Sequence, residues 1–141
     1  MNERFFSLPP EKQQRIIDAA FQVFSQSSYK GASMSEIASC SGISKALLFH
    51  YFTNKKELYL YLWNASLEMT RKMTSEYRVL ETDDFFEMLR RTLLAKCSLM
   101  EKYPHISAFS LNAYYEQYPE IKMLIRKPCM RRFSTRWTGI C

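Results

Sequence analysis

The segment that most constrains the fold is residues 33–58, SMSEIASCSGISKALLFHYFTNKKEL. Ser33 and Glu36 have the spacing of a capping box, which predicts that a helix begins here. Gly42 can adopt the left-handed conformation that ends a helix and turns the chain. Ser44 then predicts the start of a second helix. The segment therefore predicts two short helices joined by a tight turn, an arrangement that can place the second helix in the DNA major groove.

Helical signals continue on both sides of this segment. Upstream, a helix is expected to open between Leu8 and Glu11, where prolines are tolerated, and apolar residues recur at helical spacing as far as residue 24. Asn54 repeats the capping spacing with Glu57 and predicts a long helix to about residue 78. Acidic and hydroxyl caps at residues 82–84 and prolines 104 and 119 delimit further helices. The sequence predicts an all-α fold.

Several short runs also resemble a known family, the TetR (tetracycline-repressor) family. In this order and spacing they are Ile37-Ala38, Gly42-Ile43-Ser44-Lys45, Leu48-Phe49-His50-Tyr51-Phe52 and Asn54-Lys55-Lys56-Glu57-Leu58. Residues 15–33 resemble the family's first helix and the loop after it. The resemblance implies an N-terminal three-helix helix-turn-helix DNA-binding domain, followed by a partial helical domain for ligand binding and dimerisation. An unrelated helical bundle is the alternative, and the agreement of independent helix boundaries favours the family.

The resemblance also implies DNA contacts at individual positions. Lys45, Ala46 and Leu47 fall where the family places residues that face base edges, and Lys45 can donate to guanine. Serines at helix starts suit phosphate binding, whereas His50 is equally well explained as a solvated or packing histidine. Phe49 stands where the family commonly has tyrosine, so a hydroxyl hydrogen bond is lost. The predicted DNA-binding residues are Ser33, Ser35, Ser44, Lys45, Ala46, Leu47, Phe49, His50, Tyr51 and Lys55.

We expect three parts: a DNA-binding domain (1–53), an incomplete effector-binding domain (54–127) and a basic tail (128–141). The second part is rich in aromatic and methionine side chains, which make ordinary cores as readily as adaptable pockets. A pocket is expected only because the resembling family has an effector site there. Its expected lining is Trp63, Phe86, Leu89, Leu93, Met100, Phe109 and Tyr114.

The tail, PCMRRFSTRWTGIC, has no acidic residue and no sustained helical period. It is expected to be foreign to the fold, as a truncation, a frame shift or an alternative ending would produce. The alternative is a basic arm that supports non-specific DNA binding. A homodimer is expected from the resemblance, but the sequence lacks the last two helices through which family members pair, which argues against it.

Global charge does not by itself indicate DNA binding. Residues 1–125 hold 15 basic and 14 acidic side chains, and the remaining five basic side chains all lie between residues 126 and 136. The four scattered cysteines form no CxxC pair and lie near no histidine at zinc spacing, so no metal site or other cofactor is expected. No apolar run is long enough to cross a bilayer and no signal-peptide core is present, so a cytoplasmic protein is expected.

The sequence favours a DNA-binding transcriptional regulator, specifically a repressor that a small apolar or aromatic effector releases from a palindromic operator. The alternative is a truncated relative that binds small molecules or other proteins and no longer binds an operator tightly. An enzyme is disfavoured, because the sequence shows no nucleophile with a base, no phosphate loop and no metal cluster.

Overall fold

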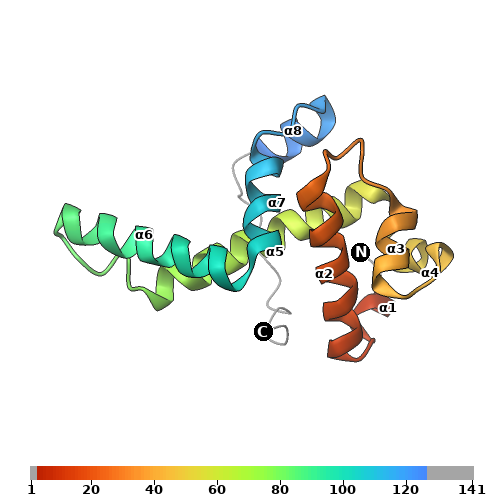
Figure 1. The fold of residues 1–141 in the computed structure, drawn as a ribbon, viewed down its shortest axis with the longest axis horizontal. Coiled ribbons are helices and arrows are strands. Elements are labelled where there is room, and N and C mark those ends of the chain that lie inside the picture. The colour runs from red at the N-terminus through yellow and green to blue at the C-terminus, as the bar shows by residue number, and fades with distance from the viewer. Residues whose placement is uncertain (1–2, 127–141) are drawn as a thin grey trace.

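The structure, a computed structural model, describes residues 3–126, and all the regular secondary structure in this part of the chain is α-helix. The helices α1–α4 form a compact head at one end of the molecule, and α5 runs out of the head and pairs with α6 in a projecting arm (Figure 1). The remaining two helices, α7 and α8, lie near the middle, with α7 packed on α2 (Figure 1). The helices are α1 (Glu3–Phe6), α2 (Pro10–Gln26), α3 (Met34–Ser41), α4 (Lys45–Tyr51), α5 (Lys55–Glu76), α6 (Phe85–Lys102), α7 (Pro104–Tyr114) and α8 (Pro119–Arg126).

The predicted all-α fold with an N-terminal helix-turn-helix is confirmed, and most expected helix boundaries lie within a few residues of those observed. Two differences stand out. The short helix α1 was not expected, and α5 ends at Glu76 rather than near residue 78. Residues 128–141, for which a basic tail was predicted, lie outside the described residues.

The turn between α3 and α4 depends on the conformation of Gly42. This glycine has a φ of 67° and ends α3 in the left-handed region. Its N–H is bonded to carbonyls of the last turn of α3, and the Ile43 amide donates to the Ala38 carbonyl at 3.0 Å. These bonds satisfy carbonyls that the end of the helix leaves without partners. The turn therefore fixes the direction in which α4 leaves α3.

Side-chain caps begin α4 and α5. The Ser44 hydroxyl accepts from the Leu47 amide at 3.1 Å, which starts α4. The Asn54 side chain accepts from the Glu57 amide at 2.8 Å, and the Glu57 carboxylate accepts from the Thr53 amide at 2.8 Å. In the simple motif the Glu57 carboxylate would accept from the amide of the cap residue, Asn54. Here it accepts from the preceding amide, that of Thr53.

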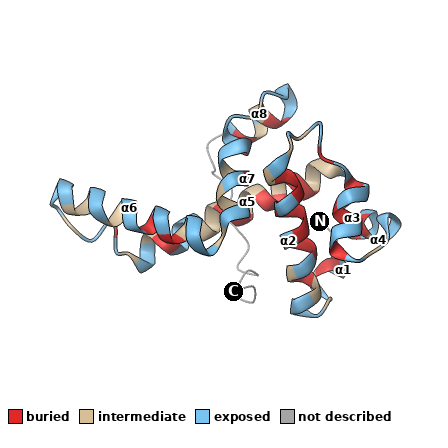
Figure 2. Ribbon diagram, viewed as in Figure 1, coloured by how far each residue is buried: buried red, intermediate tan, exposed pale blue. Residues whose placement is uncertain are grey.

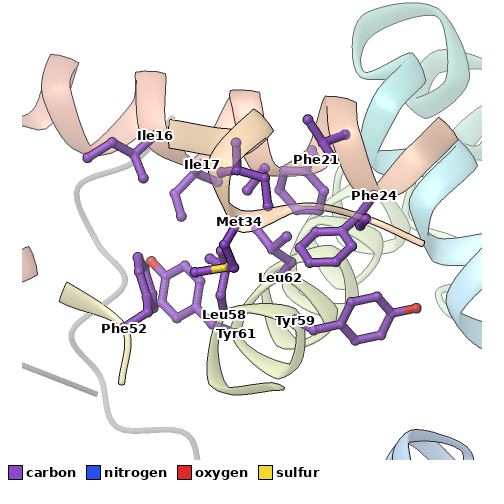
Figure 3. Close-up of a cluster of buried hydrophobic side chains, with 14 of the residues drawn as sticks. Ile16, Ile17, Phe21, Phe24, Met34, Phe52, Leu58, Tyr59, Tyr61 and Leu62 are labelled. Atoms are coloured by element: carbon purple, nitrogen blue, oxygen red, sulfur yellow. The ribbon is translucent and has the colours of Figure 1, made fainter. Parts of the chain in front are cut away.

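A single hydrophobic core joins the head to the helices after it. Apolar side chains from one face of α2 meet the first turns of α5 (Figure 3). Side chains of α7 and α8 belong to the same cluster. The buried stripe of α2 contains the apolar residues expected from the sequence, which are Ile16, Ile17, Ala20, Phe21 and Phe24. Because this core crosses the expected boundary at residues 53 and 54, the head is packed as one body with α7 and α8.

The arm, which we define as residues 70–99, has a smaller core of its own. Met73, Val79 and Ala95 are its buried apolar residues. Arg78 lies in the turn between the helices with a φ of 50°, and the Arg91 guanidinium donates to the Arg78 carbonyl at 2.8 Å. Much of the α6 surface is exposed (Figure 2). The arm therefore depends on fewer buried contacts than the head does.

The role of Gly42 can be tested by substitution. Gly42→Ala is expected to lower the free energy of unfolding by about 1 kcal/mol, because an L residue is disfavoured in the left-handed region. Crowding does not contribute, since no atom lies within 4 Å of the position of the added Cβ. Gly31→Ala is the control, because Gly31 does not have a positive φ and its added Cβ would lie 3.4 Å from Ser28 Oγ. Equal losses for the two variants in urea unfolding would contradict the assignment.

Candidate nucleic-acid interface

The solvent face of α4 presents most of the predicted base-contacting residues. Lys45, Ala46, Phe49 and His50 are exposed, and Leu47 is half-buried. The opposite side is fixed in the core, where Leu48 is fully buried together with Phe52, the C-cap residue. Because one side of α4 is anchored in the core and the other is open to solvent, α4 has a fixed position on the surface of the head.

The three predicted serines are exposed beside the N-termini of α3 and α4. Ser33 Oγ accepts from the Ser35 amide at 3.2 Å, and Ser44 Oγ accepts from the Leu47 amide. Each capping hydroxyl keeps its own hydrogen for donation, for example to a phosphate oxygen. A capping box predicts that Ser33 accepts from the amide of Glu36, the third residue of α3. In the structure it accepts from the amide of Ser35, the second residue, so this capping bond differs from the prediction.

Tyr51 lies in a different environment from the other predicted contacts. It is 6% exposed, and its ring packs edge-to-face against Phe5 with centroids 6.1 Å apart. A phenol enclosed in this way stabilises the position of α4 more directly than it can contact a ligand. The sequence pattern did not reveal this burial, because the residue that covers Tyr51 comes from α1, more than forty positions away.

Lys55 connects α5 to the loop between α2 and α3. Its ammonium donates to the Ala32 carbonyl at 3.1 Å and to the Lys30 carbonyl at 3.3 Å, and it lies 4.9 Å from the centroid of the Tyr29 ring. An ammonium has three donors, so two intramolecular bonds leave one for another acceptor. Lys55 therefore holds the loop next to α3 in addition to any contact with DNA.

Arg4 was not predicted, yet it extends the exposed face of α4. Its Nη1 lies 2.8 Å from His50 Nε2, and both side chains are exposed. The adjacent Phe5 is fully buried, which attaches α1 to the head. The only sequence feature that indicated a packed N-terminal helix was the apolar pair Phe5-Phe6, and two residues are too few to show a helical period.

The structure does not bring the predicted pocket residues together. Phe109 is fully buried in the main core and Trp63 packs at its edge. The other five, Phe86, Leu89, Leu93, Met100 and Tyr114, are exposed. A cavity of about 770 Å³ lies elsewhere, between α2, α5 and the corner of α6 and α7. Its mainly apolar lining includes Ile17, Phe21, Ala65, Met69 and Ile106, with the carboxylates Glu11 and Asp18 on α2.

Glu116 joins α7 to the head by accepting backbone hydrogen bonds. Its carboxylate accepts from the Tyr29 amide at 2.8 Å and from the amides of Gln117 and Tyr118 at 2.8 and 2.9 Å. Partial burial acts to raise the pKa of Glu116, but these hydrogen bonds outweigh it, so the pKa lies below its ordinary value. The ionised carboxylate therefore stabilises the junction between the α2–α3 loop and α7.

Among residues 3–126, no group of three or more His, Cys, Asp or Glu side chains is arranged to hold a metal ion. Within the same residues, no helix combines the length and the apolar character needed to span a bilayer.

Comparison with known proteins gives consistent matches. The sequence pattern of the "Bacterial regulatory proteins, tetR family" matches residues 16–62. The regulator AcrR of Shigella flexneri is 29% identical over 84 residues, covering 60% of this chain and 39% of AcrR. The activator FasR of Mycolicibacterium smegmatis is 42% identical over 60 residues, covering 42% of this chain and 27% of FasR.

A solved structure extends the similarity beyond the head. A TetR family transcriptional regulator from Chloroflexus aurantiacus J-10-FL superposes with a TM-score of 0.76 and 31% identity. The match covers 89% of this chain and 59% of that protein. The aligned segments thus span between about a quarter and three fifths of the length of these relatives.

An all-helical chain whose N-terminal head presents a short, capped helix after a glycine turn is a helix-turn-helix protein. Its sequence and structural matches are specific to one group of such proteins. Residues 16–62 belong to the TetR family of bacterial regulatory proteins, and the described part of the chain has the fold of a TetR family regulator.

The structural role of Lys55 can be tested without DNA. Lys55→Met retains most of the apolar stem and removes the ammonium, and it is expected to cost about 1 to 2 kcal/mol of unfolding free energy. Lys56→Met is the matched control, because Lys56 forms an exposed ion pair with Glu120 that is expected to contribute little. A midpoint of urea unfolding that moves no more for Lys55→Met than for Lys56→Met would contradict the structural role.

Proposed function

We propose that this chain regulates transcription by binding duplex DNA through the solvent face of α4. The observation that carries the proposal is the arrangement of α4, whose exposed side presents Lys45, Ala46 and His50 while Leu48 anchors its other side. A helix with side chains is about 10 to 12 Å wide, which suits a major groove about 12 Å wide. The membership in the TetR family supports the same function.

Within this proposal, each predicted residue has a defined role. Lys45 donates to a guanine edge, and Ala46 and Leu47 contact thymine methyl groups. Ser33, Ser35 and Ser44 contact phosphates together with the amides at the helix starts. Phe49 and His50 lie along the groove wall, Lys55 donates its remaining hydrogen to a phosphate, and Tyr51 positions α4 from the core.

We also propose that two copies of the head bind a palindromic operator. One head alone contacts a short half-site, and linking two heads greatly raises the effective affinity. In this proposal residues 1–53 bind the operator, and residues 54–127 provide pairing and, together with α2, the effector cavity. Residues 128–141 have no proposed role in base contact.

A small apolar or aromatic effector is proposed to regulate binding from the cavity beside α2. That cavity touches Ile17 and Phe21, which belong to the helix that supports the head. An effector changes DNA affinity only if it binds one arrangement of the heads more tightly than the other. We propose repression as the outcome by analogy with the family, although one similar protein, FasR, is an activator.

A second candidate function is binding of a small molecule or another protein without tight operator binding. The observation that favours it is the apolar surface of α6, where Phe86 is 78% exposed and Met100 is 62% exposed. Apolar side chains exposed along one helix are common at interaction sites.

The base-contacting role of Lys45 gives the first test of DNA binding. Duplexes are selected from a palindromic library, and affinities are then measured for the best duplex and for a scrambled one. Lys45→Ala is expected to reduce the ratio of the two affinities by roughly tenfold, because a base contact is lost. Lys55→Ala is the comparison variant and should weaken both complexes alike. Equal, sequence-blind losses for both variants would show that Lys45 does not contact bases.

The pairing of heads is tested by solution mass. Light scattering on the full chain bound to the selected palindrome is expected to give two chains per duplex, because each half-site holds one head. A single chain that enriches no palindrome would reject the operator proposal and favour the second function.

A further inference from the structure

The N-terminal helix α1 is attached to the head by an aromatic cluster. The ring of Phe5 is fully buried, with centroids 5.0 Å from Phe52 and 5.9 Å from Tyr61. The side-chain amide of Gln13, itself buried in α2, donates to the carbonyls of Phe6 at 3.2 Å and Leu8 at 2.8 Å. These contacts fix both the helix and the turn that follows it, so the position of Arg4 is determined by the core.

Arg4 lies at the opposite end of α4 from Lys45. Its Nη1 is 2.8 Å from Nε2 of His50, the penultimate residue of α4, and Arg4 is exposed. The seven residues of α4 span about 10 Å, which is close to the width of the major groove. When the N-terminal end of α4 meets base edges, a cation at the other end is therefore near a phosphate strand.

We propose that Arg4 is a DNA-backbone contact and that His50 positions it. A guanidinium has five N–H donors in a planar fork, so it can donate to the imidazole and to a phosphate oxygen at the same time. The inference rests on the proposed function, but it adds a residue that lies before the segment matched by the family pattern, residues 16–62. In this role α1 forms part of the DNA interface in addition to covering the core.

A purely structural role for Arg4 makes a different prediction. A cation near the C-terminus of α4 can stabilise that helix through its dipole, and this effect needs no DNA. A phosphate contact instead releases counterions when DNA binds, so its loss changes the salt dependence of binding. Salt dependence therefore separates the two roles.

The experiment measures affinity by fluorescence anisotropy for the selected palindrome and a scrambled duplex over a range of salt concentrations. Arg4→Ala is expected to weaken both complexes and to lower the slope of log K against log salt by about 0.9 per head. Between about 50 and 200 mM salt, the variant should lose roughly threefold less affinity per head than the wild type does. Arg4→Lys should restore most of the slope, because it keeps the charge.

Two controls accompany Arg4→Ala. Glu3→Ala alters the same short helix without removing the cation, and it should leave the slope unchanged or raise the affinity. Lys96→Ala removes a cation from an exposed position on α6, remote from the head, and should change neither quantity. Urea unfolding of each variant shows whether α1 remains attached.

The outcomes separate this inference from the proposed function. An unchanged slope for Arg4→Ala overturns the inference, whether or not the unfolding midpoint moves, and leaves the proposed function intact if Lys45→Ala still loses discrimination. A wild-type chain that binds no duplex overturns both proposals. A lower slope on both duplexes, with Arg4→Lys restoring it, supports a phosphate contact.

Discussion

Contacts between four aromatic rings join the head to α5 and α7. Phe24 and Tyr59 meet edge-to-face with centroids 4.9 Å apart, and Phe109 lies 5.0 Å from Tyr59 and 5.4 Å from Phe21. These rings come from α2, α5 and α7, so one cluster fixes three helices relative to one another. Each pair is worth about 0.5 to 1.5 kcal/mol beyond the burial of its area. The position of α2, and with it of the head, therefore depends on helices that follow the head in the chain.

This coupling gives a physical basis for regulation. The Asn112 side chain donates to the Ser25 carbonyl at 2.8 Å, and Glu116 binds the Tyr29 amide, so α7 is bonded to both the end of α2 and the loop after it. Phe21 belongs to the aromatic cluster and also lines the cavity beside α2. A molecule that enters this cavity contacts the packing between head and body directly. It can shift the orientation of the head only by favouring one packing of that junction over another.

Local signals in the sequence predicted the framework of the head well. Gly42, Ser44 and Asn54 act within a few residues of themselves, and each one starts or ends a helix as expected. Features that depend on distant residues were not predictable. The burial of Tyr51 requires Phe5, and the hydrogen bonds of Lys55 require the carbonyls of the α2–α3 loop. On α6, the exposed apolar residues recur with the same helical period that a buried stripe would have. Periodicity shows that residues share a face, but it does not show what covers that face.

The arm and the head differ in what stabilises them. On α6, Glu87 is held by Arg90 and Arg91, and these hydrogen bonds lower the pKa of Glu87 to about 2. Ion pairs at the protein surface contribute little to stability, because water screens them. The arm then depends mainly on the small cluster around Met73, Val79 and Ala95, whereas the head has a continuous core with many fully buried side chains. Regions with few buried contacts open at lower free energy than the core of a protein. Local opening of the arm can therefore leave α4 in place, because Leu48 and Tyr51, which anchor α4, belong to the main core.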